Sequence, residues 1–159
     1  MKKKHPFEPV IDANSKILIL GSLPSVRSVQ EGFYYMHPQN RFWKMLSVVL
    51  NCDLVNASIW MKKEILLHHG IALYDIVAEC EIEASKDSTI QKVGVQDIVS
   101  LIQTSKIERI ILNGKTAYSL FIQVYPQWTK MAICAPSTSS ANATYSLEKL
   151  IETWSKYLR

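Results

Sequence analysis

The sequence predicts an α/β fold: a three-layer α/β/α arrangement with a central four-stranded parallel sheet. Short apolar runs that stop at a small or polar residue, such as residues 17–20 before Gly21, alternate along the chain with segments whose apolar residues recur at helical spacing. Parallel strands that are buried on both faces have this continuous apolar character. Their alternation with helices is typical of a sheet covered by helices on both faces.

Each element is placed by its own pattern. The predicted strands are residues 16–21, 71–77, 110–113 and 131–134, and the predicted helices are residues 40–51, 58–69, 95–102, 117–124 and 147–158. Ser58 is a plausible N-cap of the second helix and Gly70 a plausible C′ residue. We expect residues 1–15 to be a loose lead-in and residues 78–94 to be a polar extended loop.

Length and composition place limits on the function. The 159 residues fit one domain spanning residues 1–159, and the formal charge of +4 mildly favours polyanionic partners. The three cysteines are far apart and form no CxxC pair, so no metal site and no iron–sulfur cluster is expected. The basic start is not followed by an apolar segment, and no run is apolar enough to span a bilayer. We therefore expect a cytoplasmic monomer without a cofactor.

Four motifs resemble a known family when they are taken in order. They are GSLPS at 21–25, GFYYMHPQNRFWK at 32–44, LNGKTAY at 112–118 and PSTSSANA at 136–143. Together they resemble the uracil-DNA glycosylase superfamily over residues 16–154. The string HPQNRFWK is similar to the mismatch-specific uracil-DNA glycosylases, whereas GSLPS and PSTSSAN are more similar to the DNA-deoxyinosine (hypoxanthine-DNA) glycosylases. The resemblance implies a uracil-DNA glycosylase-like fold and a DNA substrate.

The loop after the first strand departs from the wider superfamily at one important position. In most members an Asp or Asn, third in a GxDP or GxNP motif, handles the attacking water, and here that position is Leu23. The resemblance to the deoxyinosine branch implies that Asn40 is the catalytic residue instead. A carboxamide can accept from water or donate to a base, but it cannot act as a general base at neutral pH. From spacing alone, Asn40 is equally an N-cap of the helix that follows Pro38.

A base that is taken out of the duplex must be held by its face and its edge. The resemblance to the mismatch-specific enzymes places Tyr35 at the position of their stacking Phe, although an aromatic loop cluster would explain the same residue. Ser22 and Leu23 are expected to line the base cavity, with backbone amides near Ser22 as donors. Asp75, at the end of the second strand, can accept a purine N1–H or can orient a loop. Asp87 and Ser88 are weaker candidates for the same contact.

The DNA backbone needs hydroxyl, amide or basic groups. The loop that contains Ser137, Thr138 and Ser139 offers them, as does Lys115 after the third strand, although serine-rich loops also form turns and exposed lysines are commonly only solvated. The corresponding superfamily motif begins with His or Asn and carries a Leu that fills the vacated stack. Here the two positions are Ala135 and Ser139. The residue that fills the stack is therefore not identified by the motif.

The resulting hypothesis is a monofunctional DNA glycosylase that removes deaminated bases from double-stranded DNA, hypoxanthine first, without metal or cofactor. No lysine occupies the place of a Schiff-base nucleophile, so we expect an abasic product without strand cleavage. A mismatch-specific uracil/thymine-DNA glycosylase is one alternative, and a non-catalytic DNA-binding module is another. A nucleoside hydrolase is disfavoured because the sequence has no multi-Asp metal cluster.

Overall fold

A four-stranded parallel sheet forms the centre of the molecule, in the computed structural model that describes residues 2–4, 6–81 and 94–159. Its strands follow the order β3-β2-β6-β7. They are β2 (Ile17–Gly21), β3 (Ile71–Asp75), β6 (Arg109–Asn113) and β7 (Ala132–Ala135). All neighbouring pairs are parallel, which confirms the predicted α/β class and the strand count.

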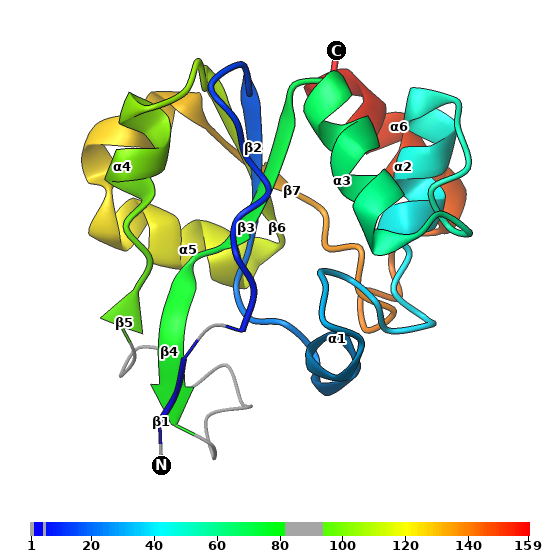
Figure 1. Cartoon of the computed structure of the whole chain (residues 1–159), viewed down its shortest axis with the longest axis horizontal. Coiled ribbons are helices and arrows are strands. Elements are labelled where there is room, and N and C mark those ends of the chain that lie inside the picture. Colours follow the sequence, from blue (N-terminus) through cyan, green and yellow to red (C-terminus); the bar gives the residue numbers. More distant parts are fainter. Residues whose placement is uncertain (1, 5, 82–93) are drawn as a thin grey trace.

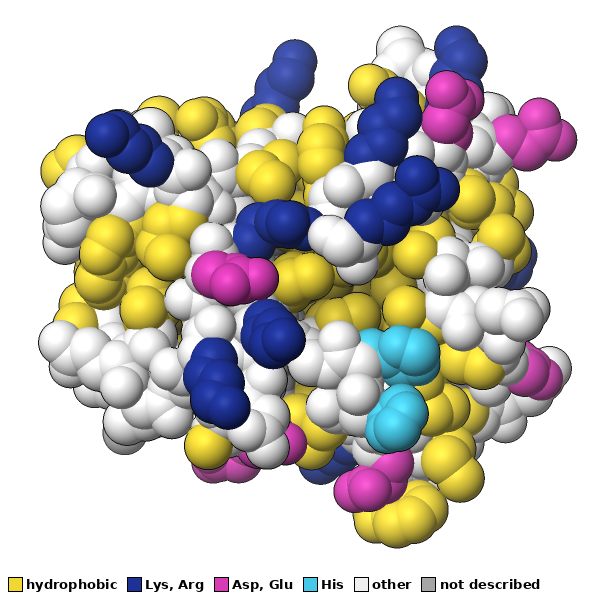
Figure 2. Space-filling view, turned by 90° about the horizontal axis from the view of Figure 1, so that it is seen from above, with side chains coloured by type: hydrophobic (Ala, Val, Ile, Leu, Met, Phe, Trp, Pro, Cys, Tyr) yellow, Lys and Arg dark blue, Asp and Glu magenta, His cyan; other side chains and the backbone are white. Residues whose placement is uncertain are grey.

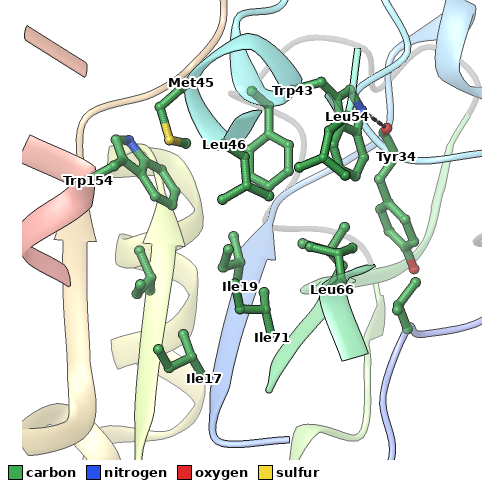
Figure 3. Packing of buried hydrophobic residues seen from close by; sticks show 14 of the residues in the cluster. Ile17, Ile19, Tyr34, Trp43, Met45, Leu46, Leu54, Leu66, Ile71 and Trp154 are labelled. Carbon is green, nitrogen blue, oxygen red and sulfur yellow. Dashed lines mark hydrogen bonds between the residues drawn. The ribbon is translucent and has the colours of Figure 1, made fainter. Parts of the chain in front are cut away.

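Helices cover both faces of this sheet (Figure 1). α2 (Phe42–Leu50), α3 (Ile59–His68) and α6 (Leu147–Tyr157) lie on one side, and α4 (Ile98–Gln103) and α5 (Lys115–Val124) lie on the other. Alternate residues of a strand point to opposite faces, so Ile17 and Ile19 pack with the first group while Leu18 and Leu20 pack with the second. Figure 3 shows Ile17 and Ile19 beneath the side chains of α2, including Met45 and Leu46. The sheet is therefore packed on both faces by a hydrophobic core.

The strand register places the carboxyl ends of the strands at a common edge. Gly21 at the end of β2 pairs with Asp75 at the end of β3, and Asn113 at the end of β6 pairs with Ala135 at the end of β7. The loops after these strands therefore start side by side. Ligands of open α/β sheets bind in the crevice beyond such an edge.

The opposite edge, where the strands begin, carries much of the positive charge. Lys16 precedes β2 and Lys106 precedes β6, and both are exposed. Figure 2 looks onto this edge, because the strands run from top to bottom in Figure 1, and shows Lys and Arg side chains gathered across it. The net charge of the chain therefore does not by itself mark the edge that carries the unusual loops.

Part of the chain that we expect to be irregular is paired. β4 (Val77–Glu81) leaves the central sheet after Asp75 and forms a second, antiparallel sheet between β1 (Lys2–Lys4) and β5 (Gly94–Val95). Val10 is buried and bridges Leu73. The expectations of a loose lead-in and of a loop that starts at residue 78 are thus wrong for these segments, because their pairing is non-local. Asp87 and Ser88 lie outside the described residues.

Other element ends show where local signals work. The Ser58 hydroxyl accepts from the Met61 N–H at 3.1 Å, and Gly70 has a φ of 71°, so the predicted cap and C′ residue of α3 are confirmed. α4 begins later than predicted, at Ile98, because Asp97 caps it. Two short elements are not predicted: α1 (Val26–Glu31) and the 3-10 helix η2 (Pro126–Met131). Among the described residues, no helix has the length and apolar character needed to cross a membrane.

Candidate active site

A cavity of about 360 Å³ opens at the carboxyl edge of the sheet. Its walls come from five segments of the chain. They are residues 21–26 with Ser28 at and after the end of β2, Tyr34, Tyr35 and Asn40 before α2, Asp75 at the end of β3, Asn113 at the end of β6, and residues 137–139 after β7. The fold thus brings Tyr35, Ser22, Leu23, Asp75 and Asn40 to one cavity.

Asn40 is held at the wall of this cavity by its carboxamide oxygen. Oδ1 accepts the Phe42 N–H at 2.9 Å, which ties it to the start of α2, and also accepts the Thr138 hydroxyl at 2.9 Å. Asn40 therefore contacts the start of α2 and also lines the cavity, although Arg41 and not Asn40 is the N-cap residue of this helix. Within the described part of the chain, Nδ2 has no hydrogen-bond partner. The group that Asn40 leaves available is a donor, because its acceptor already has two partners.

Thr138 connects Asn40 to a residue that the sequence analysis did not single out. Thr138 is fully buried; its N–H donates to Asn113 Oδ1 at 3.0 Å, and its hydroxyl oxygen accepts from Asn113 Nδ2 at 3.0 Å. The burial of Thr138 and the pairing of its polar atoms do not support its predicted contact with the DNA backbone. Its hydroxyl instead donates to Asn40 Oδ1 and holds that side chain in place. In the sequence, the feature that could have pointed to Asn113 is that it is the polar residue at the end of an apolar strand.

Tyr35 forms the aromatic wall of the cavity. Its ring stacks on Phe42 with a centroid distance of 4.2 Å, and its backbone has a φ of 57°. That left-handed conformation is strained for a bulky residue and is typical of functional sites. The hydroxyl is buried without a hydrogen bond of regular geometry to any described residue. Burial, and next the charge of Asp75, raise the pKa of Tyr35 far above its ordinary value, so the phenol stays neutral.

Gly21 allows the buried groups of this wall to approach the strand end. A Cβ at this position would lie 2.6 Å from Asp75 Oδ1 and 2.9 Å from the Tyr35 hydroxyl. The absence of a side chain at Gly21 is therefore required by close contact with its neighbours, and not by its backbone conformation. Asp75 is only 2% exposed and lies at the cavity wall next to the phenol. In the sequence, Gly21 is recognisable only as the residue that ends a strand.

Comparisons with known proteins agree with this geometry. A family model described as the uracil DNA glycosylase superfamily matches residues 8–159. The chain belongs to the uracil DNA glycosylase superfamily. A relative from Methanosarcina acetivorans, named hypoxanthine DNA glycosylase, is 33% identical over 98% of both chains. A second protein of that name, from Methanosarcina barkeri, is 32% identical over 88% of this chain and 89% of its own.

A solved structure has the same architecture. The solution NMR structure of a candidate uracil DNA glycosylase from Methanosarcina acetivorans matches with a TM-score of 0.81 and 31% identity, covering 100% of this chain and 98% of that one. The expectation of a uracil-DNA glycosylase-like fold is confirmed. In the present chain, Leu23 lines the cavity, and its side chain offers no polar group to a water molecule.

A second hollow of about 670 Å³ adjoins the base cavity. The two share four lining residues, Ser22, Asn113, Ser137 and Ser139. Lys115 lines only the larger one, where it is exposed. The structure therefore places Ser137, Ser139 and Lys115 on one surface next to the base cavity. Thr138, by contrast, lies beneath that surface.

Arg41 braces the loop that separates the two hollows. Its guanidinium donates to the carbonyl oxygens of Ser139 at 2.7 Å and Asn142 at 3.1 Å, and also to that of Tyr145. Its own N–H donates to the carbonyl of Thr138 at 3.0 Å. Arg41 therefore fixes the loop that positions Asn40. The sequence analysis quoted this arginine only as part of a motif, since its partners lie about a hundred residues away.

Proposed function

We propose that this protein is a monofunctional DNA glycosylase that removes deaminated bases from double-stranded DNA, with hypoxanthine as the first substrate. Membership of the superfamily supports the enzyme class, and two near full-length relatives that are named hypoxanthine DNA glycosylase support the identity of the base. One observation supports the mechanism above all: Asn40 lies at the cavity with its oxygen engaged and its amino group available. The protein acts as a cytoplasmic monomer in this proposal.

The proposed role of Asn40 is to donate to the departing base. When the C1′–N9 bond breaks, its electron pair leaves with the purine, and the negative charge spreads over the acceptor atoms of the ring. A preorganised donor in a cavity sheltered from water stabilises such developing charge. Water adds its oxygen to C1′ and releases a proton to solvent, and solvent protonates the base. The products are free hypoxanthine and an abasic site.

The remaining walls suit a 6-oxopurine. The Tyr35 ring supplies an aromatic wall for the face of the base, and stacking on such a ring is worth about 1–3 kcal/mol. We assign to Asp75 the N1–H of the base, a donor that hypoxanthine has and adenine lacks. Ser22 and Leu23 complete the cavity. Hydroxyl and backbone groups of Ser137 and Ser139, with Lys115 beside them, are assigned to the phosphates of the strand on either side.

The test is a glycosylase assay on labelled duplexes that contain inosine, uracil or xanthine, followed by alkaline cleavage of abasic sites. We expect the wild-type chain to release hypoxanthine fastest and Asn40→Ala to lose at least about 10²-fold in rate. Asn14→Ala, at an exposed turn far from the cavity, is the matched control and is expected to behave as wild type. Full activity of Asn40→Ala would contradict the assignment of Asn40.

The same assay separates the competing functions. A faster rate on G:U than on inosine would favour a mismatch-specific uracil glycosylase, which the description of the NMR neighbour as a candidate uracil DNA glycosylase keeps as the second candidate. Salt-dependent DNA binding without release of any base would indicate a non-catalytic module. A covalent adduct trapped by borohydride would contradict the monofunctional mechanism.

A further inference from the structure

Helix α1 (Val26–Glu31) lies at the mouth of the base cavity, below the sheet and apart from both helical layers (Figure 1). The segment that leads into it forms one wall of the cavity, through Leu23, Pro24 and Val26. The Ser25 hydroxyl accepts the Ser28 N–H at 3.1 Å and so caps the helix. Pro24 restricts the backbone just before this cap. A stiff, capped turn therefore presents the first residue of α1 at the rim.

The burial of α1 is the reverse of what a helix usually shows. Ser28 is its buried residue, with a hydroxyl that accepts the Met36 N–H at 2.9 Å, whereas Val26 is 75% exposed and Val29 is 45% exposed. The helix is thus held to the protein by its polar side and leaves apolar side chains uncovered. An isolated exposed valine needs no explanation, but an apolar side left outward at the rim of a substrate cavity indicates a partner.

The opposite rim carries no large apolar side chain over residues 137–142. These residues read STSSAN, so the apolar side-chain groups of this stretch are the methyl groups of Thr138, which is fully buried, and of Ala141. Arg41 binds the carbonyls of Ser139 and Asn142 and keeps this rim in place. The two rims therefore differ in chemistry: one is small, polar and braced, and the other is apolar and stands out from the surface.

Removal of a base from the duplex leaves a gap between its stacked neighbours, and an apolar side chain that enters the gap offsets the lost stacking. We propose that Val26 is this wedge, and that α1 delivers it into the base stack while the target base occupies the cavity. This inference rests on the proposed function, because it concerns the same duplex substrate. The group that covers the exposed Val26 side chain is therefore the base pair next to the extruded nucleotide, and Val29, outside the cavity lining, is not part of this contact.

The experiment compares single-turnover release of hypoxanthine from a duplex and from the same strand without its complement. We expect Val26→Ala to lower the ratio of the duplex rate to the single-strand rate on the order of tenfold, because a single strand has no stack to refill. Val29→Ala is the matched control, because it is the same substitution about one helical turn away and outside the cavity lining. We expect it to leave the ratio of the two rates unchanged. A pyrene nucleotide opposite the inosine, which fills the gap itself, restores the duplex rate of Val26→Ala.

Two results would overturn the wedge. One is a Val26→Ala ratio equal to that of the wild type, and the other is an equal loss on both substrates without rescue by pyrene. The wedge is also tested apart from catalysis by the fluorescence of a 2-aminopurine placed beside the target, which rises when the neighbouring base is extruded. If the wild type releases no base but the fluorescence rise depends on Val26, the proposed glycosylase function fails while the wedge stands. A rise that does not depend on Val26 contradicts the wedge itself.

Discussion

The two walls of the base cavity are built by different forces. On one wall, hydrogen bonds of 2.9–3.0 Å connect Asn113, Thr138 and Asn40, and the amino group of Asn40 has no partner among the described residues. On the other, Tyr35 and Asp75 are packed against Gly21, and the Tyr35 hydroxyl has no regular hydrogen bond to any described residue. Hydrogen bonds fix the direction of a polar group, whereas packing fixes the shape of a surface. The hydrogen-bonded wall is therefore suited to cleavage of the glycosidic bond, and the packed wall to recognition of the base.

The largest effect expected on the hydrogen-bonded wall comes from Asn40→Asp. The carboxylate still accepts from the Phe42 N–H and the Thr138 hydroxyl, and it suits a helix start, so the free energy of unfolding should change by less than about 1 kcal/mol. The donor toward the base is lost, and a negative charge faces a departing anion. We expect single-turnover release of hypoxanthine to fall by about 10²–10³-fold or more.

The same variant separates two roles for Asn40. If the residue held the attacking water as an acceptor, a carboxylate would serve at least as well, and the rate would stay the same or rise. Measured rates from pH 5 to 9, with denaturation by urea as the check on folding, distinguish the two. A rate equal to or above that of the wild type would contradict the donor role and show that the residue at position 40 accepts a hydrogen bond from the attacking water.

On the packed wall, Gly21→Ala is expected to act through shape. The new Cβ would lie 2.6 Å from Asp75 Oδ1 and 2.9 Å from the Tyr35 hydroxyl, so at least one of them must move. Overpacking of this kind costs about 1–3 kcal/mol of folding free energy. We expect a smaller loss in rate than for Asn40→Asp, on the order of tenfold, with a marked rise in KM because the wall recognises the base.

The control for this substitution is Gly32→Ala at the end of α1. Gly32 has a φ of 79° and no atom within 4 Å of an added Cβ, so the substitution strains the backbone without filling the cavity. We expect about 1 kcal/mol of lost stability and an unchanged KM. Equal changes in KM for the two variants would mean that the packed wall has no special part in recognition.

Much of the fold follows from local sequence signals. Strands β2, β3 and β6 are largely buried and therefore appear as apolar runs, and α2, α5 and α6 show the helical stripe of a half-buried surface. Helix α3 has no such stripe and is marked instead by Ser58 and Gly70 at its ends. The antiparallel sheet of β1, β4 and β5 has no such signal because it depends on pairing between distant polar segments. Helix α1 was not predicted because its valines face outward and its buried residue is a serine. The spacing of its apolar residues therefore does not indicate a face that packs on a core.

The site could be predicted as a set of loops but not as a set of contacts. Strand order places Asn40, Tyr35 and Asp75 around one cavity, and the sequence analysis named all three. The burial of Thr138 could not be predicted, because residue type does not reveal which hydroxyl is turned inward. Asn113 was missed because its role depends on a partner 25 residues away in sequence. Side-chain direction in loops is set by tertiary packing.

The smallest expected effect is that of Tyr35→Phe, and it appears only at high pH. Burial holds the Tyr35 phenol neutral by raising its pKa far above the ordinary 10.0, whereas the unfolded phenol ionises near that value. The contribution to stability is therefore fully present below about pH 10 and is lost as pH rises beyond it, by about 1.4 kcal/mol per pH unit for one proton. We expect the variant to unfold as the wild type does at pH 7 and to show a shallower alkaline loss.

Tyr34→Phe sharpens this last comparison between a packed phenol and a hydrogen-bonded one. Burial, and next the charge of Asp75, also raise the pKa of Tyr34, but its hydroxyl donates to the Glu8 carbonyl at 2.9 Å. Its removal should cost about 1 kcal/mol at pH 7, where Tyr35→Phe costs nothing. Urea denaturation of both variants at pH 7 and pH 10.5 is the measurement. A loss for Tyr35→Phe at pH 7 as large as that for Tyr34→Phe would mean that the Tyr35 hydroxyl has a partner in solution, and the cavity wall would then be held by hydrogen bonds on both sides.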